Sequence, residues 1–235
     1  MAEVYEYVRD IRHSLQSINR FFCNEDFLRR LRRIFAEAEQ MIPEKSIFFR
    51  ARIYLEEDRL KPKEPGFLGL NAEESFVNLT TDWPNNGRMN PTGITVLYMA
   101  SDESTAIREI KPFPDQLYSV AAIKTLKPLK IANLSDRYSM QDDDFDRYLS
   151  VYVQEWLSLG SRERDYVFPQ FVASYCQHLG YDGIAYRSKY ATRAEQNQNK
   201  GINYTIFNFA KCKPERSRLY RVEEIAARIS EYTEE

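Results

Sequence analysis

Hydrophobic residues recur at helical spacing at the start of the chain. Over 3–22 they follow the steps of an amphipathic helix, at Val4, Val8, Ile11, Leu15, Ile18 and Phe22. Asn24 can cap a second helix, whose pattern continues to about Met41, because its side-chain oxygen can accept from the first amides. Two such helices cannot bury their apolar faces alone. We therefore expect an N-terminal helical segment, 1–44, that docks on a main domain, 45–235, or on a second copy of the chain.

Beyond residue 45 the pattern alternates irregularly between strand-like and helix-like stretches. β-rich apolar runs predict strands over 46–54, 94–100, 117–125, 129–134, 183–188 and 202–209. Helical spacing predicts helices over 103–111 and 142–159, and a third that starts at Pro169 and stops at Gly180. We expect 55–90 to be irregular and to fold over something, 189–201 to be an exposed polar loop, and 219–235 to start extended and end helical. This order is typical of an α+β fold.

Composition and charge narrow the function classes. The net charge is -2, which gives no global electrostatic case for nucleic acid or an anionic membrane as a partner. Three cysteines without paired spacing and two histidines argue against a disulfide framework, a metal site or a Ser-His-Asp triad. Glycine patterns typical of Rossmann and P-loop sites are missing. The acidic start does not resemble a signal peptide and no apolar run is long enough to span a membrane, so we expect a cytoplasmic protein.

Two groups of arginines stand out. The second predicted helix carries a cluster of four arginines, Arg29, Arg30, Arg32 and Arg33. The cluster could bind a partner or nucleic acid, or it could form a solvated helix face paired to Glu37 and Glu39. We favour the solvated face, because the chain as a whole is acidic. Alternation along 46–54 places Arg50 and Arg52 on the same face of a strand. That strand could present a cationic face from the interior, or it could be an edge strand whose face is solvated.

The stretch 87–112 contains three further candidates. Its glycines and Pro91 pre-order a bend that presents Arg88. Tyr98 lies near the end of the strand that follows. Glu109 lies beside the apolar face of the next helix, where it could be a site residue or an ordinary surface carboxylate.

Taken in order, these pieces resemble the RES-domain family over 48 to about 209. The motifs that carry the resemblance are Phe49-Arg50-Ala51-Arg52, Gly87-Arg88-Met89-Asn90-Pro91, Leu97-Tyr98-Met99-Ala100, Thr105-Ala106-Ile107-Arg108-Glu109, the stretch from Tyr166 to Gln170, Gly180-Tyr181-Asp182-Gly183-Ile184, Tyr186-Arg187-Ser188 and Ile202-Asn203-Tyr204-Thr205-Ile206-Phe207. The resemblance implies a compact mixed β-sheet core with flanking helices, similar to that of ADP-ribosyltransferases. Pro169 and the loop 189–201 depart from the family pattern.

The resemblance also implies an activity. Family members cleave NAD between nicotinamide and ribose, and the ADP-ribose passes to water, phosphate or a protein. Many are toxins neutralised by a helical partner. We therefore expect NAD as substrate with no further cofactor, and an antitoxin or regulatory protein as partner. The N-terminal helices could also form a homodimer. Protein ADP-ribosylation and a non-catalytic nucleotide- or partner-binding module remain alternatives.

The family roles carry over residue by residue. Arg50 and Arg88 would hold the pyrophosphate, because a guanidinium binds phosphate oxygens with two parallel bonds, with Arg52 as support. Tyr98 would stack on nicotinamide, Glu109 would stabilise the oxocarbenium-like centre or bind ribose hydroxyls, and Ser188 resembles the family serine. The implied catalytic set is thus Glu109, Tyr98 and Ser188. The implied NAD-binding set is Arg50, Arg52, Arg88, Tyr98 and Gln170.

Overall fold

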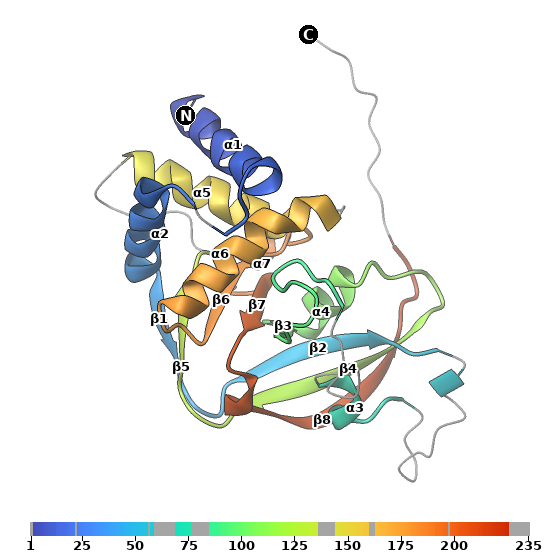
Figure 1. The fold of residues 1–235 in the computed structure, drawn as a ribbon. Helices are drawn as coiled ribbons and strands as arrows, with labels where there is room; N and C mark the ends of the chain where they lie inside the picture. Colours follow the sequence, from blue (N-terminus) through green and yellow to red (C-terminus); the bar gives the residue numbers. More distant parts are fainter. Residues whose placement is uncertain are drawn as a thin grey trace, which may run out of the picture.

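The computed structural model describes residues 2–21, 23–55, 57–58, 69–76, 85–135, 144–159, 163–196 and 198–225. One mixed sheet of eight strands runs through them in the order β1-β5-β6-β7-β3-β2-β4-β8 (Figure 1). Neighbouring strands are antiparallel except β5 and β6, which are parallel. The strands are β1 (Glu39–Ile42), β2 (Ile47–Ile53), β3 (Leu97–Ala100), β4 (Leu117–Thr125), β5 (Leu129–Asn133), β6 (Gly183–Arg187), β7 (Ile202–Ile206) and β8 (Cys212–Arg221). With its helices this is the α+β fold that the sequence predicts.

The sheet curls over one of its own faces. β4 and β5 stand five places apart in the strand order, but only 126–128 link them. Five strand spacings in a flat sheet would cover about 24 Å, whereas the link from 125 to 129 spans at most about 14 Å. The enclosed face therefore forms a core shared by both halves, which includes Phe48, Leu97, Met99, Ile123, Ile131, Tyr204 and Ile206. Within it the rings of Phe48 and Tyr204 lie 4.7 Å apart.

Four helices cover the outer face of β5 and β6: α1 (Ala2–Ser17), α2 (Glu25–Glu37), α5 (Asp144–Ser158) and α6 (Val167–His178) (Figure 1). They share one apolar core with those strands, built from residues such as Val8, Leu15, Phe27, Leu149, Phe168 and Ile184. The N-terminal helices thus dock on the main domain of their own chain, α1 against α5 and α6 and α2 against α5 and β5, which is one of the two arrangements expected. The division at residue 44 and the homodimer stay predictions. Among the described residues no helix is long and apolar enough to cross a membrane.

Two arginines of the cluster on α2 anchor that helix to α5. Arg30 donates to Asp26 at 2.8 Å and to Asp146 at 2.5 Å, and Arg33 donates to Asp146 at 2.8 Å. Asp146, on α5, is 2% exposed. A buried carboxylate needs this compensation, because removing it from water is costly. The expected partners Glu37 and Glu39 were wrong for these two arginines; Glu39 instead pairs with Lys130.

The remaining differences from the sequence prediction concern boundaries and short elements. The second helix stops at Glu37, and Glu39–Ile42 becomes β1, because pairing with β5 outweighs the helical pattern. The first helix ends at Ser17, so Ile18 is 75% exposed. β3 begins at Leu97 rather than at 94, and α6 begins at Val167, two residues before Pro169. Short helices not predicted are α3 (Ala72–Ser75), η2 (Glu163–Tyr166), α7 (Arg193–Gln196) and η3 (Phe209–Lys211).

Two predictions fall largely outside the described residues. These are the helical end of the tail, from 226 onward, and most of the segment 55–90, including Phe67 and Trp83. The tail prediction also missed most of β8, which starts at Cys212. Its polar sequence hides it, since an edge strand pairs on one side only.

Candidate active site

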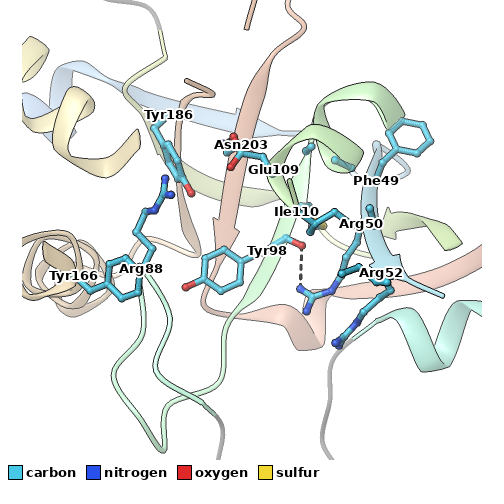
Figure 2. A pocket seen from close by; sticks show the side chains of 15 residues that line it. Phe49, Arg50, Arg52, Arg88, Tyr98, Glu109, Ile110, Tyr166, Tyr186 and Asn203 are labelled. Carbon is cyan, nitrogen blue, oxygen red and sulfur yellow. Dashed lines mark hydrogen bonds between the residues drawn. The ribbon is translucent and has the colours of Figure 1, made fainter. Parts of the chain in front are cut away.

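A pocket of about 550 Å³ lies on the outer face of the middle strands, beneath α4 (Glu103–Glu109). Its floor is a row of directly paired residues across four strands: Phe49 of β2, Ala100 of β3, Asn203 of β7 and Tyr186 of β6. Of their chain neighbours, Phe48 and Tyr204 pack into the enclosed core on the other face, whereas Arg50 and Met99 also line the pocket. Strand register therefore decides which side chains meet in the pocket (Figure 2).

The mouth of the pocket forms where β2 and β3 separate. β2 pairs with β4 over its whole length but with β3 only at Phe49 and Ala100. Beyond that pair, Arg50 bridges the opening, where its Nη1 donates to the carbonyl oxygen of Tyr98 at 3.0 Å (Figure 2). β2 lies inside the sheet, so the edge-strand alternative for Arg50 and Arg52 was wrong.

Both arginines carry buried nitrogens that lack a partner. The Nε atoms of Arg50 and Arg52 make no hydrogen bond within the described part of the chain. Burial lowers the pKa of Arg50 to about 9, and the neighbouring charge of Arg52 adds to this effect. Burial also lowers the pKa of Arg52. A buried cation without a neighbouring anion is unfavourable. The mouth of the pocket is therefore suited to bind an anion.

Arg88 reaches the pocket from the bend that precedes β3. Its Nη1 donates to the carbonyl oxygens of Leu157 at 3.2 Å and Ser158 at 2.6 Å. These are the last residues of α5, where the helix dipole attracts a cation. Figure 2 shows the guanidinium directed toward Tyr186, with Tyr166 beside it.

The bend itself is held by side chains from two other elements. The hydroxyl of Tyr98 accepts from the amide of Met89 at 2.9 Å and donates to Oδ1 of Asn90 at 2.7 Å. The amide nitrogen of Gln170 donates to the carbonyl oxygens of Gly87 at 2.7 Å and Asn90 at 3.1 Å. A Cβ at Gly87 would lie 2.3 Å from Asn90 Oδ1, so no larger residue fits without displacing the bend.

Gln170 therefore differs from the other predicted NAD-binding residues. It is 8% exposed and is not among the residues that line the pocket. In the structure its amide secures the bend that presents Arg88.

Two tyrosines form aromatic walls. The ring of Tyr98 lines the pocket while its hydroxyl is engaged with the bend, and burial raises its pKa. Burial raises the pKa of Tyr186 to about 12; nearby Arg88 opposes this effect and Glu109 adds to it. Both phenols are therefore neutral near pH 7.

Glu109 provides the carboxylate of the pocket. α4 is capped by Asp102, which accepts from the amide of Thr105 at 2.8 Å, and its Ala106 packs against β2 and β3. Glu109 follows at the end of this helix. Its Oε1 accepts from Ser188 Oγ at 2.5 Å and from Asn203 Nδ2 at 2.8 Å. The surface alternative for this residue was wrong: among the described residues that line the pocket, it is the one carboxylate.

Ser188 lies behind the pocket rather than in its wall. It is 3% exposed and reaches the pocket through Glu109. Sequence reasoning gave no role to Asn203, Tyr186, Tyr166 or Phe49, although all four line the pocket. An asparagine inside a buried strand is uncommon, and this was the available signal for Asn203.

A mouth lined by arginines, aromatic walls and one held carboxylate make up an enzyme-like site on a mixed α+β sheet. A family model described as RES domain matches residues 70–226. The chain belongs to the RES domain family. The matched range includes Arg88, Tyr98 and Glu109, but it starts after Arg50 and Arg52, which the resemblance had included.

Two further comparisons give less. No curated protein matches the chain. Among solved structures, the crystal structure of the M. tuberculosis MbcT-MbcA toxin-antitoxin complex contains a chain that is 12% identical with a TM-score of 0.45. The match covers 84% of this chain and 93% of that chain.

Proposed function

We propose that this protein is an NAD-consuming enzyme that cleaves the bond between nicotinamide and ribose, and that it acts as a toxin or defence effector. One observation carries the proposal: the Glu109 carboxylate, held at one oxygen, shares a pocket with Arg50, Arg52 and Arg88. Family membership and the earlier resemblance supply the substrate. The residue chemistry makes that substrate plausible at this site.

The charges and size of the pocket support a dinucleotide. NAD carries a pyrophosphate, and the unpartnered nitrogens of Arg50 and Arg52 would recover their lost hydration by bonding its oxygens. The volume of about 550 Å³ lies within the usual range for small-molecule sites. The neutral rings of Tyr98 and Tyr186 offer faces on which nicotinamide can stack.

Bond cleavage assigns a role to the carboxylate. The C1′–N bond breaks with its electron pair, so nicotinamide leaves neutral and the ribose gains oxocarbenium character. Glu109 would stabilise that positive charge, and water, phosphate or a protein nucleophile would complete the reaction. With water, the products are nicotinamide, ADP-ribose and a proton. A preorganised group of this kind contributes about 3 kcal/mol, or roughly 100-fold in rate.

Nicotinamide release tests the proposal. Purified protein is incubated with NAD and the products are separated by chromatography and identified by mass. We expect Glu109→Gln, which keeps the shape and an acceptor for both donors, to lose about 100-fold or more in rate. Glu103→Gln is the matched control, because Glu103 lies on the same helix and pairs with Arg218 away from the pocket. The proposal fails if wild type releases no nicotinamide or if Glu109→Gln releases it equally well.

The biological part needs a separate test. Induced expression of wild type should deplete cellular NAD and arrest growth, and Glu109→Gln should do neither. A toxin of this kind also requires restraint, so we propose a neutralising partner protein. Labelled NAD that leaves its label on a polypeptide would favour ADP-ribose transfer. NAD binding by calorimetry without turnover would favour a binding module.

A further inference from the structure

Two donors from different parts of the chain converge on one oxygen of Glu109. Ser188, just after β6, and Asn203, within β7, both contact Oε1. Within the described residues no donor contacts the second oxygen, Oε2, although the residue lines the pocket. The two oxygens of the carboxylate are therefore not equivalent.

The direction of both hydrogen bonds is determined by their surroundings. Ser188 Oγ accepts from the amide of Tyr190 at 3.1 Å, so its single proton is directed to Glu109. Asn203 faces a carboxylate, which only accepts, so its NH₂ group points to Oε1. Ser188 consequently has no proton to offer a ribose while it holds Glu109.

Strand register places Asn203 where it can do this. It is 5% exposed and lies between Ala100 on β3 and Tyr186 on β6. The small Ala100 packs against Ala106 of α4, the helix that brings Glu109 over the sheet. Asn203 is thus a rigid donor on a central strand, which is a better support than a loop residue.

From this geometry we propose that Asn203 is a positioning residue that, with Ser188, fixes Oε1 of Glu109 and leaves Oε2 to face the reacting ribose. The proposal rests on the NAD-cleaving function proposed above. Both donors act through Glu109 and determine the aim of its carboxylate: Ser188 lies behind the pocket, and the NH₂ group of Asn203, on the pocket floor, is directed to Oε1.

Removing either donor should lower kcat and spare KM. A hydrogen bond to a charged group contributes about 1.5–3 kcal/mol, so Ser188→Ala and Asn203→Ala should each lose roughly 10- to 100-fold in kcat. We expect KM for NAD to change by less than about threefold, because uniform binding is untouched. Thermal unfolding checks that each variant is folded. If Asn203→Ala does not fold, Ser188→Ala still tests the proposal.

Asn203→Asp gives a sharper test. Two carboxylates at this distance share a proton, and an aspartic acid can replace the amide donor only while that proton is present. The kcat ratio of Asn203→Asp to wild type should therefore fall by about tenfold or more from pH 5 to pH 8. Among the described residues that line the pocket, the other titratable side chains are three arginines and three tyrosines: Arg50, Arg52, Arg88, Tyr98, Tyr166 and Tyr186.

Asn208→Asp is the matched control. Asn208 donates to Asp182 at 3.1 Å, so its replacement also creates a carboxylate pair, but one outside the pocket. Its kcat ratio to wild type should not change with pH. A pH-independent ratio for Asn203→Asp, or an unchanged kcat in both alanine variants, would overturn the proposal.

A second readout separates this proposal from the function on which it rests. Glutamate labelled with ¹³C at the carboxyl carbon gives a Glu109 signal, identified by its loss in Glu109→Gln. In Asn203→Asp that signal should show an additional titration step as the shared proton leaves, whether or not NAD is cleaved. If wild type releases no nicotinamide, the proposed function fails; if the extra step is missing, the pairing of Asn203 with Glu109 fails.

Discussion

Replacing Tyr98 by phenylalanine separates the two uses of this side chain. The change keeps the ring that lines the pocket and removes the hydroxyl that bonds Met89 and Asn90. Each buried partner left unsatisfied costs about 1–3 kcal/mol, so the two together should lower the free energy of unfolding by about 2–6 kcal/mol. For a chain of this size that corresponds to a Tm lower by about 4–24 °C.

Tyr98→Phe should also weaken substrate binding indirectly. The lost bonds release the bend next to Arg88, so we expect KM for NAD to rise by about tenfold, the value of one charge-assisted hydrogen bond. Urea unfolding and nicotinamide-release kinetics measure the two effects. Tyr175→Phe is the control, because that half-buried ring lies on α6 and stacks on His178 away from the pocket. A Tyr98→Phe variant within about 0.5 kcal/mol of wild type, with unchanged KM, would refute this account of the bend.

Three further outcomes are expected. Arg50→Met removes a buried, uncompensated charge, so calorimetry should show that the ligand-free variant is more stable than wild type by about 1–2 kcal/mol. Pyrophosphate should no longer stabilise this variant. A destabilised variant would contradict this. Gly87→Ala forces a Cβ to 2.3 Å from Asn90 Oδ1, and unfolding and kinetics should show a loss of about 1–3 kcal/mol with a raised KM. Hydrogen bonds from Arg30 and then Arg29 lower the pKa of Asp26 to about 2. Its stabilising effect should thus be complete above pH 4 and lost as the pH falls toward 2, so urea unfolding should show wild type and Asp26→Asn converging at low pH.

Five residues that the sequence nominated as site residues lie together in the structure. Arg50, Arg52, Arg88, Tyr98 and Glu109 all line one pocket, although 59 positions separate the first from the last. Motif order was sufficient because each motif is local: a strand pair of arginines, a bend, a strand end and a capped helix. Their roles toward NAD stay predictions.

Sequence reasoning placed the supporting residues less well. Ser188 and Gln170 were expected at the substrate, yet one holds Glu109 and the other holds the bend. Asn203 was not nominated. A hydrogen-bond partner across strands depends on register, and register is decided by how all strands pack together, so no local pattern reveals it.

The fold shows the same division. Periodicity predicted the main helices and most strands, because the repeat of apolar residues records which face is buried. It missed most of β8 and assigned most of β1 to a helix, because each strand is defined by its pairing, β8 with β4 and β1 with β5. The curl of the sheet is equally invisible in the sequence, since it follows from short links between distant strands.

The sequence by itself determined the α+β class, the family resemblance and the chemical types available in 87–112: a cation, an aromatic ring and a carboxylate. The tertiary structure decided that Arg50 bridges the opening between β2 and β3, and that Glu109 is held at one oxygen by residues 79 and 94 positions away. The physical reason is that residue type and local spacing are properties of the chain, whereas burial, charge compensation and the aim of a carboxylate arise only when distant segments pack together.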